Sequence, residues 1–181
     1  TRALAGLGRR QLLEDPFAAL PPAQDTADWL TRRQLAPVLL LEDTLRDDLG
    51  LGTDATRAVL ADLIGTVGAR LLGRRFPALT AEAWAAAPAD TRERMARRVF
   101  ARLGNIASAD VHTTDTTLAL QVTACRFVSL LRQVDRPHLG TLFCEADAVF
   151  FERPHAPVSL TRTTTLARGG PACDFLFRLR P

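Results

Sequence analysis

The sequence contains no lysine. All 23 of its basic residues are arginine, against 20 acidic residues, and the formal net charge is +3. Abundant alanine and arginine without lysine indicates a GC-rich genome. The arginines are scattered among carboxylates and form no continuous basic run of the kind that binds a phosphate backbone. We therefore expect no nucleic-acid partner.

Long apolar runs are also missing, since none reaches the roughly 20 residues that cross a bilayer. The first residues, TRALAGLGRRQLLEDP, lack the apolar core of a signal peptide. Cysteine is scarce, and three widely spaced cysteines do not make a disulfide framework. These absences predict a cytoplasmic protein with reduced thiols and no membrane partner.

Several catalytic and cofactor motifs are absent as well. The chain has no glycine-rich phosphate loop, no dinucleotide-binding fingerprint, no GxSxG nucleophile elbow and no HExxH zinc helix. We expect no cofactor. What remains is ordinary globular composition, 47% hydrophobic and 24% charged, in 181 residues. That length predicts one domain, residues 1–181, with its own core.

The first half of the chain has the pattern of helices. Residues 1–25 are expected to form an N-terminal loop or extension, followed by a helical part over residues 26–105. The first of its helices begins at a cap near Asp25 and ends at Gly50, and Pro37 is expected to kink or divide it.

A second helix begins at Thr53, and a third covers residues 90–103 and is closed by Gly104. The second helix carries an apolar stripe at helical spacing, which we expect to be core. The stripe consists of Val59, Leu60, Leu63, Val67 and Leu71.

The second half, residues 106–181, mixes strand and helix patterns. The expected elements are a strand at 116–125, helices at 126–134 and 137–151, and strands at 158–167 and 172–179 joined at Gly169-Gly170. Helices first and antiparallel strands later indicate an α+β domain. We expect N-terminal helices packed on one side of a small antiparallel sheet with a C-terminal β-hairpin.

Cys144 and Asp147 share one face of the expected helix at 137–151, at a spacing that lets their side chains meet. Gly140 on that face leaves space, and Phe151 is able to line a pocket. Two interpretations remain open. Either the thiol and carboxylate are reactive, or the cysteine is core and the carboxylate belongs to a structural ion pair.

Arg162 falls on the apolar side of the expected strand at 158–167, where an unpaired guanidinium is very costly. Its partner is either an internal carboxylate, from Asp147 or Asp174, or the carboxylate of a bound ligand held by two parallel hydrogen bonds. Cys173, beside the expected hairpin, is most simply a core residue.

Taken together, Cys125, then Cys144-Glu-Ala-Asp147, then the stretch RTTTLARGGPACDF resemble the L-2-amino-thiazoline-4-carboxylic acid hydrolase family. The resemblance covers about Leu118 to Phe177. It implies a small-molecule enzyme that acts on a C–N or C=N bond of a compact, carboxylate-bearing, heterocyclic substrate. Hydrolysis and a ring-forming rearrangement in secondary-metabolite biosynthesis both fit this resemblance, which also suggests a homodimer.

In this interpretation Cys144, or Cys125 in its place, is the nucleophile, provided that nearby positive charge lowers the thiol pKa. Asp147 is the general acid or base, or orients water. A general-base reaction through Asp147 without a covalent intermediate fits the residues equally well. Arg162 holds the substrate carboxylate. The side chains expected to converge on one pocket are Cys125, Cys144, Asp147, Arg162, Phe151 and Thr164.

A more distant similarity is to the vinyl-reductase-type ligand-binding domain, shared with bacterial aromatic sensors and related to trafficking-complex subunits. Some sensor members bind zinc through Glu-x-x-Cys and a later Cys, where this chain has Arg162, Thr165 and Cys173. Because two ligands are missing, we expect no metal. This similarity implies a non-catalytic small-molecule-binding domain with core cysteines. His112 and His155 fall in loop-like stretches and are expected at the surface.

Overall fold

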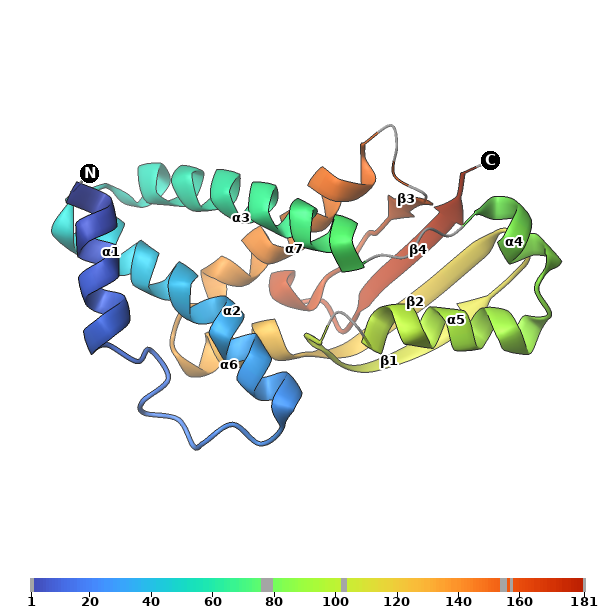
Figure 1. Ribbon diagram of the computed structural model, residues 1–181, viewed down its shortest axis with the longest axis horizontal. Coiled ribbons are helices and arrows are strands. Elements are labelled where there is room, and N and C mark those ends of the chain that lie inside the picture. The colour runs from blue at the N-terminus through green and yellow to red at the C-terminus, as the bar shows by residue number, and fades with distance from the viewer. Residues whose placement is uncertain (1, 76–79, 102–103, 154–155, 157, 181) are drawn as a thin grey trace.

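The computed structural model describes residues 2–75, 80–101, 104–153, 156 and 158–180. Helices dominate the first half, and strands alternate with helices in the second (Figure 1). The helices of the first half are α1 (Arg2–Leu13), α2 (Thr26–Asp43), the π-helical η1 (Thr44–Asp48), α3 (Thr53–Arg75), α4 (Ala81–Ala86) and α5 (Ala89–Ala101). The second half contains β1 (Ile106–Thr113), β2 (Thr117–Cys125), α6 (Arg126–Gln133), η2 (Pro137–Leu139), α7 (Gly140–Phe151), β3 (Val158–Thr161), η3 (Leu166–Arg168) and β4 (Cys173–Leu179).

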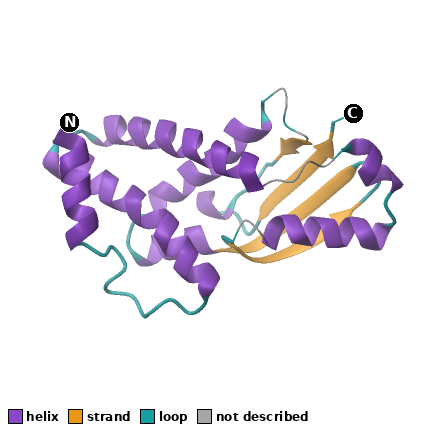
Figure 2. Cartoon of the chain, in the orientation of Figure 1, coloured by secondary structure: helices purple, strands orange, loops and turns teal. Residues whose placement is uncertain are grey.

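The strands form one antiparallel sheet in the order β1-β2-β4-β3. In Figure 2, α5 lies across the sheet, while α1, α2 and α3 gather toward the opposite end of the molecule. This arrangement confirms the predicted α+β class. None of the helices in the described ranges has both the length and the apolar character needed to cross a membrane.

The C-terminal hairpin is confirmed, with Val158 opposite Leu179 and Thr161 opposite Leu176. Its connection is wider than predicted, because β3 already ends at Thr161 and the chain then passes through η3. Gly169 follows η3 with a φ of 83°, a left-handed conformation that glycine adopts without strain.

The N-terminal segment differs from the expected loop, since residues 2–13 form α1. Arg10 of this helix forms an ion pair with Asp48 of η1 at 3.3 Å. A residue 38 positions away in the sequence therefore anchors the helix, and local sequence patterns do not reveal such a contact. Residues 14–25 contain turns and irregular chain, as predicted.

Helix α2 begins as expected, because the side chain of Asp25 accepts a hydrogen bond from the backbone N–H of Asp28 at 2.6 Å. The expected division at Pro37 is wrong, since α2 continues through that residue. Gly50, with a φ of 68°, follows the η1 segment and ends the helical run.

Besides α1, helix α4 and the edge strand β1 were not predicted. His112 therefore lies in a strand rather than in a loop, but it is exposed at the surface, as predicted. The third expected helix is α5, which ends by Ala101 among the described residues. Leu103, its predicted last residue, and His155 lie outside the described residues.

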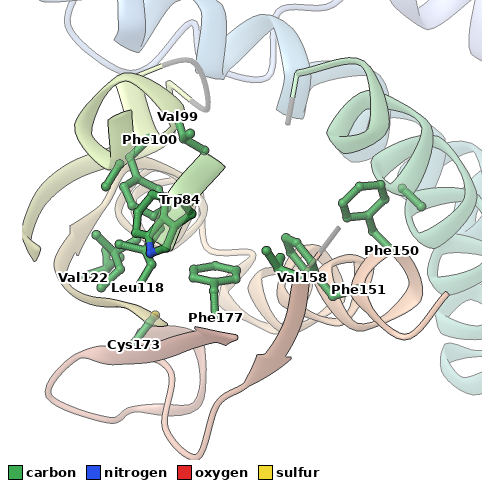
Figure 3. Packing of buried hydrophobic residues seen from close by; sticks show 13 residues of the cluster. Trp84, Val99, Phe100, Leu118, Val122, Phe150, Phe151, Val158, Cys173 and Phe177 are labelled. Atoms are coloured by element: carbon green, nitrogen blue, oxygen red, sulfur yellow. The ribbon is translucent and has the colours of Figure 1, made fainter. Parts of the chain in front are cut away.

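The core has two parts, and α7 contributes to both. Phe150 and Phe151 of α7 pack with the sheet, where Phe177 lies between them and Trp84 (Figure 3). At the other end of α7, Leu142 and Ala146 pack with α2, α3 and α6. Helix α7 therefore spans the boundary between the sheet core and the helical core.

Helices α3 and α7 pack unusually closely at Gly68. A Cβ atom added to Gly68 would lie 2.8 Å from the Cβ of Ala146, closer than two side-chain carbons approach. The absent side chain allows the two backbones to come together. This contact fixes the part of α7 directly beside Asp147.

The predicted core stripe of α3 is mostly wrong. Leu60 is buried, but the other four residues are between 39% and 44% exposed. Because α3 contacts α7 through Gly65, Gly68 and Gly73, these four side chains point away from that contact and stay partly exposed. Periodicity identified the apolar side of α3 correctly but not what lies against it.

Candidate functional site

A cavity of about 450 Å³ lies where the two core regions meet. Residues from α2, α3, β2, α6, α7 and β4 line it, and most of them are apolar. Among the described residues that line it, the charged ones are Arg33 of α2 and Asp147 of α7. The volume and the few polar groups match those of a small-molecule site.

Asp147 and Arg162 form an ion pair at the edge of this cavity. One terminal guanidinium nitrogen of Arg162 donates to Asp147 Oδ2 at 3.0 Å, and the other donates to the Cys144 carbonyl at 3.0 Å. The guanidinium also lies 5.2 Å from the ring centre of Phe175. Arg162 therefore lies beside Asp147 and the backbone of Cys144; that these residues form one functional site stays a prediction.

The partner of Arg162 is thus the internal carboxylate of Asp147. The other candidate, Asp174, instead accepts hydrogen bonds from the backbone N–H groups of Thr163 at 3.0 Å and Thr164 at 2.6 Å, and from the Thr163 hydroxyl. Partial burial opposes ionisation, but these hydrogen bonds lower the pKa of Asp174 to about 2. Asp174 therefore stabilises the backbone conformation of the two residues that follow Arg162.

Burial raises the pKa of Asp147 to about 6, although Arg162 acts in the opposite direction through charge and hydrogen bonding. A carboxyl group with this pKa exchanges its proton near neutral pH. Groups that carry out general acid–base catalysis are tuned in this way. Asp147 therefore combines a suitable pKa with direct access to an apolar cavity.

The three cysteine thiols, in contrast to Asp147, have pKa values shifted away from neutral pH. Burial, reinforced by the nearby charge of Asp147, raises the pKa of Cys144 to about 12. Burial also raises the pKa of Cys125 and of Cys173. The condition attached to a cysteine nucleophile, a lowered pKa, is not met in this structure. No three His, Cys, Asp or Glu side chains in the described part of the chain lie close enough to bind a metal ion.

The remaining predicted site residues divide into two groups. Cys125 and Phe151 line the cavity, as Cys144 and Asp147 do. Neither Arg162 nor Thr164 is among the described lining residues. The Thr164 hydroxyl instead donates to the Ala172 carbonyl at 2.7 Å.

Cys125 reaches the cavity for a reason that strand alternation did not predict. Alternation places Cys125 with Gln121 and Thr123, which are both exposed. Cys125 is the last residue of β2 and the N-cap of α6, and the pairing with β1 is irregular opposite it. The chain turns there, so Cys125 lines the cavity with Val122 instead.

The sequence analysis did not identify Arg33 as a cavity residue, and it did not predict that the apolar stripe of α3 borders the cavity. Arg33 is exposed at the cavity and lies over the ring of Trp29, 4.7 Å from its centre. A single exposed arginine on a helix gives no signal of its own in a chain with 23 arginines. The α3 stripe did give a signal, which was interpreted as core.

Comparison with known families identifies the family of the chain. Residues 40–177 match the family described as L-2-amino-thiazoline-4-carboxylic acid hydrolase. The match spans well over half of the chain, and the chain belongs to this family. Comparison with curated proteins gives no match.

Among solved structures, the chain is similar to a trafficking protein particle complex subunit 3 from Naegleria fowleri, which is covalently bound to palmitic acid. The two share 15% sequence identity with a TM-score of 0.43, over 86% of this chain and 95% of the other. A similarity this weak says nothing about the ligand of the present protein.

Proposed function

We propose that the protein is an enzyme that hydrolyses a C–N or C=N bond of a small carboxylate-bearing substrate, with Asp147 as the proton-transfer group. The observation that carries the proposal is the Asp147 carboxyl, whose pKa is raised to about 6 beside an apolar cavity. Membership of a family named for a hydrolase supports the reaction class.

In the proposed reaction, water attacks the carbon of the C=N bond. As the new C–O bond forms, the π electrons of the C=N bond move to the nitrogen. Asp147, about nine-tenths ionised at pH 7 with this pKa, accepts a proton from the water and donates it to that nitrogen, which gives a tetrahedral adduct. Asp147 then accepts the proton of the new hydroxyl and donates it to the nitrogen as the C–N bond breaks, leaving a C=O group and an amine. A ring-forming rearrangement uses the same transfers, with an internal nucleophile of the substrate in place of water.

Arg162 has a supporting role in this scheme. It lies behind Asp147, keeps the carboxylate ionised at neutral pH and fixes its orientation through the bond at 3.0 Å. The substrate carboxylate is assigned to Arg33, the cation among the described residues that line the cavity. Cys144 stays a neutral thiol beside Asp147, so no covalent intermediate is required.

The test is turnover of L-2-amino-thiazoline-4-carboxylic acid, followed as loss of the thiazoline ring. Asp147→Asn should lower kcat about 10²- to 10⁴-fold, the usual contribution of a general base. Cys144→Ala should retain most of the activity. Glu145→Gln is the matched control, because Glu145 is a carboxylate on the same helix that does not line the cavity. Full activity of Asp147→Asn would exclude this mechanism.

The second candidate is a non-catalytic small-molecule-binding domain, favoured by the apolar cavity and by thiols with raised pKa values. In that case ligands bind without turnover, and Asp147→Asn binds them as well as or better than the wild type, because a buried charge is removed. Any turnover that depends on Asp147 decides in favour of the enzyme.

A further inference from the structure

The open side of the cavity is formed by an apolar surface of α3. Leu63, Val67 and Leu71 line the cavity and are 41%, 44% and 39% exposed. Exposed single apolar residues are common, but three on one helix side that border one cavity form a continuous surface. Keeping that surface in water is unfavourable by roughly 25 cal/mol per Å² of apolar area.

Among the described residues that line the cavity, few side chains are polar, so a wholly polar ligand is a poor fit. Such a ligand would give up hydrogen bonds to water and find few replacements, which costs about 1–3 kcal/mol for each unsatisfied group. The polar lining groups apart from thiols are Arg33, Gln34, Asn105 and Asp147. Most of the ligand surface must therefore be apolar.

The volume of the cavity also indicates a ligand larger than a bare amino-thiazoline carboxylate. At about 30 Å³ for each water-sized group, 450 Å³ holds about fifteen non-hydrogen atoms. A bare amino-thiazoline carboxylate, with roughly nine such atoms, leaves a large part of the cavity unfilled, since binding sites usually enclose most of their ligand.

We propose that the substrate carries an apolar aliphatic or aromatic substituent that lies against Leu63, Val67 and Leu71, while its reacting C–N or C=N bond lies beside Asp147. This inference rests on the proposed function and defines its substrate class further. The substituent covers the apolar surface of α3, and the free energy of that burial positions the reacting bond at the buried carboxyl.

Two valines of α3 provide a matched test. Val59 and Val67 are 43% and 44% exposed on the same helix, but only Val67 is among the described residues that line the cavity. The probe is naphthalene-1-sulfonate, an apolar body with one anionic group and a size of about fourteen non-hydrogen atoms that suits the cavity, titrated by its fluorescence. Val67→Asn should weaken binding about 10-fold, whereas Val59→Asn should change it less than about 2-fold.

Wild-type affinity in Val67→Asn, or equal weakening in both variants, overturns the placement on α3. If Val67→Asn does not fold by circular dichroism, Leu63→Asn replaces it, because Leu63 also lines the cavity and is 41% exposed. The probe assay does not depend on turnover.

Turnover tests the substrate class separately. For wild-type protein, kcat/KM should rise about 10-fold or more when an amino-thiazoline carboxylate bears a butyl or phenyl substituent, and Val67→Asn should lose most of this gain. Equal turnover with and without the substituent overturns the inference and leaves the proposed function standing. Probe binding that depends on Val67, without turnover of any compound, overturns the proposed function and leaves the apolar ligand class.

Discussion

Replacing Arg162 with glutamine tests the electrostatic coupling that sets the proton affinity of Asp147. The two charged groups are 3.0 Å apart, and their side chains are 14% and 24% exposed. An opposite charge at this range lowers a carboxyl pKa by about 1 to 3 pH units. Because burial already raises the pKa of Asp147 to about 6 with Arg162 present, the carboxyl of the variant should titrate about 1 to 3 pH units higher.

The sign of the effect on stability follows from linkage. The folded protein binds the Asp147 proton more tightly than the unfolded chain, in which the carboxyl has its ordinary pKa of 3.8. Stability contributed by this group is therefore present at low pH and lost as pH rises through the folded pKa. In the wild type the loss is about 3 kcal/mol and is complete above about pH 6.

In Arg162→Gln the loss of folding stability continues to higher pH, because the folded pKa of Asp147 is higher. Each additional pH unit costs about 1.4 kcal/mol, so the variant should be about 1.4 to 4 kcal/mol less stable than the wild type at pH 9 from this effect. At pH 5 the carboxyl is mostly protonated in both proteins. Only a pH-independent difference should remain there, from the lost contacts with Phe175 and the Cys144 carbonyl.

The assay is urea unfolding at pH 5, 7 and 9, followed by the fluorescence of Trp84, which is completely buried. The same substitution in an Asp147→Asn background is the control. There Arg162→Gln should cost the same free energy at every pH, because the titrating partner is gone. A destabilisation that does not change with pH in the wild-type background would refute the coupling.

Two further predictions concern packing and thiol chemistry. Gly68→Ala should destabilise the protein by about 1–3 kcal/mol, because the added Cβ would lie 2.8 Å from the Cβ of Ala146. Gly65→Ala should instead stabilise the protein by up to about 1 kcal/mol, because the nearest atom to its added Cβ, at 3.4 Å, belongs to the exposed side chain of Val149. Thermal unfolding of both variants checks this pair, and equal effects would contradict it. Cys144 should react with iodoacetamide about 10³-fold more slowly at pH 7 than a free cysteine, because its pKa is about 12. Mass spectrometry after timed labelling measures the rate, and rapid modification of Cys144 would restore the nucleophile hypothesis.

The sequence predicted those features that depend on local geometry. Cys144 and Asp147 are three residues apart on a helix, a spacing that fixes their common face wherever the helix lies. Arg162 sits among apolar neighbours, and the cost of burying a lone charge required a partner. The choice between Asp147 and Asp174 depended on how the hairpin connection packs against α7, which local patterns do not contain.

Features that depend on the neighbours of an element were not predictable. The stripe on α3 was identified, but periodicity does not tell a covered apolar side from one that borders a cavity. Strand β1 lies at the edge of the sheet and carries many polar residues, so its pattern resembles that of a loop. Helix α1 depends on an ion pair between Arg10 and Asp48, a long-range contact.

The two sides of α3 have separate neighbours, and this separation has a consequence for how the protein can change. Gly68 holds the helix against α7, whereas Leu63, Val67 and Leu71 face the cavity. The proton affinity of Asp147 is set by its burial and by the charge and hydrogen bond of Arg162. If the proposed function holds, exchanges among Leu63, Val67 and Leu71 should alter which molecules are accepted more than they alter proton transfer by Asp147. Libraries of variants at these three positions are then the direct way to look for an altered substrate range.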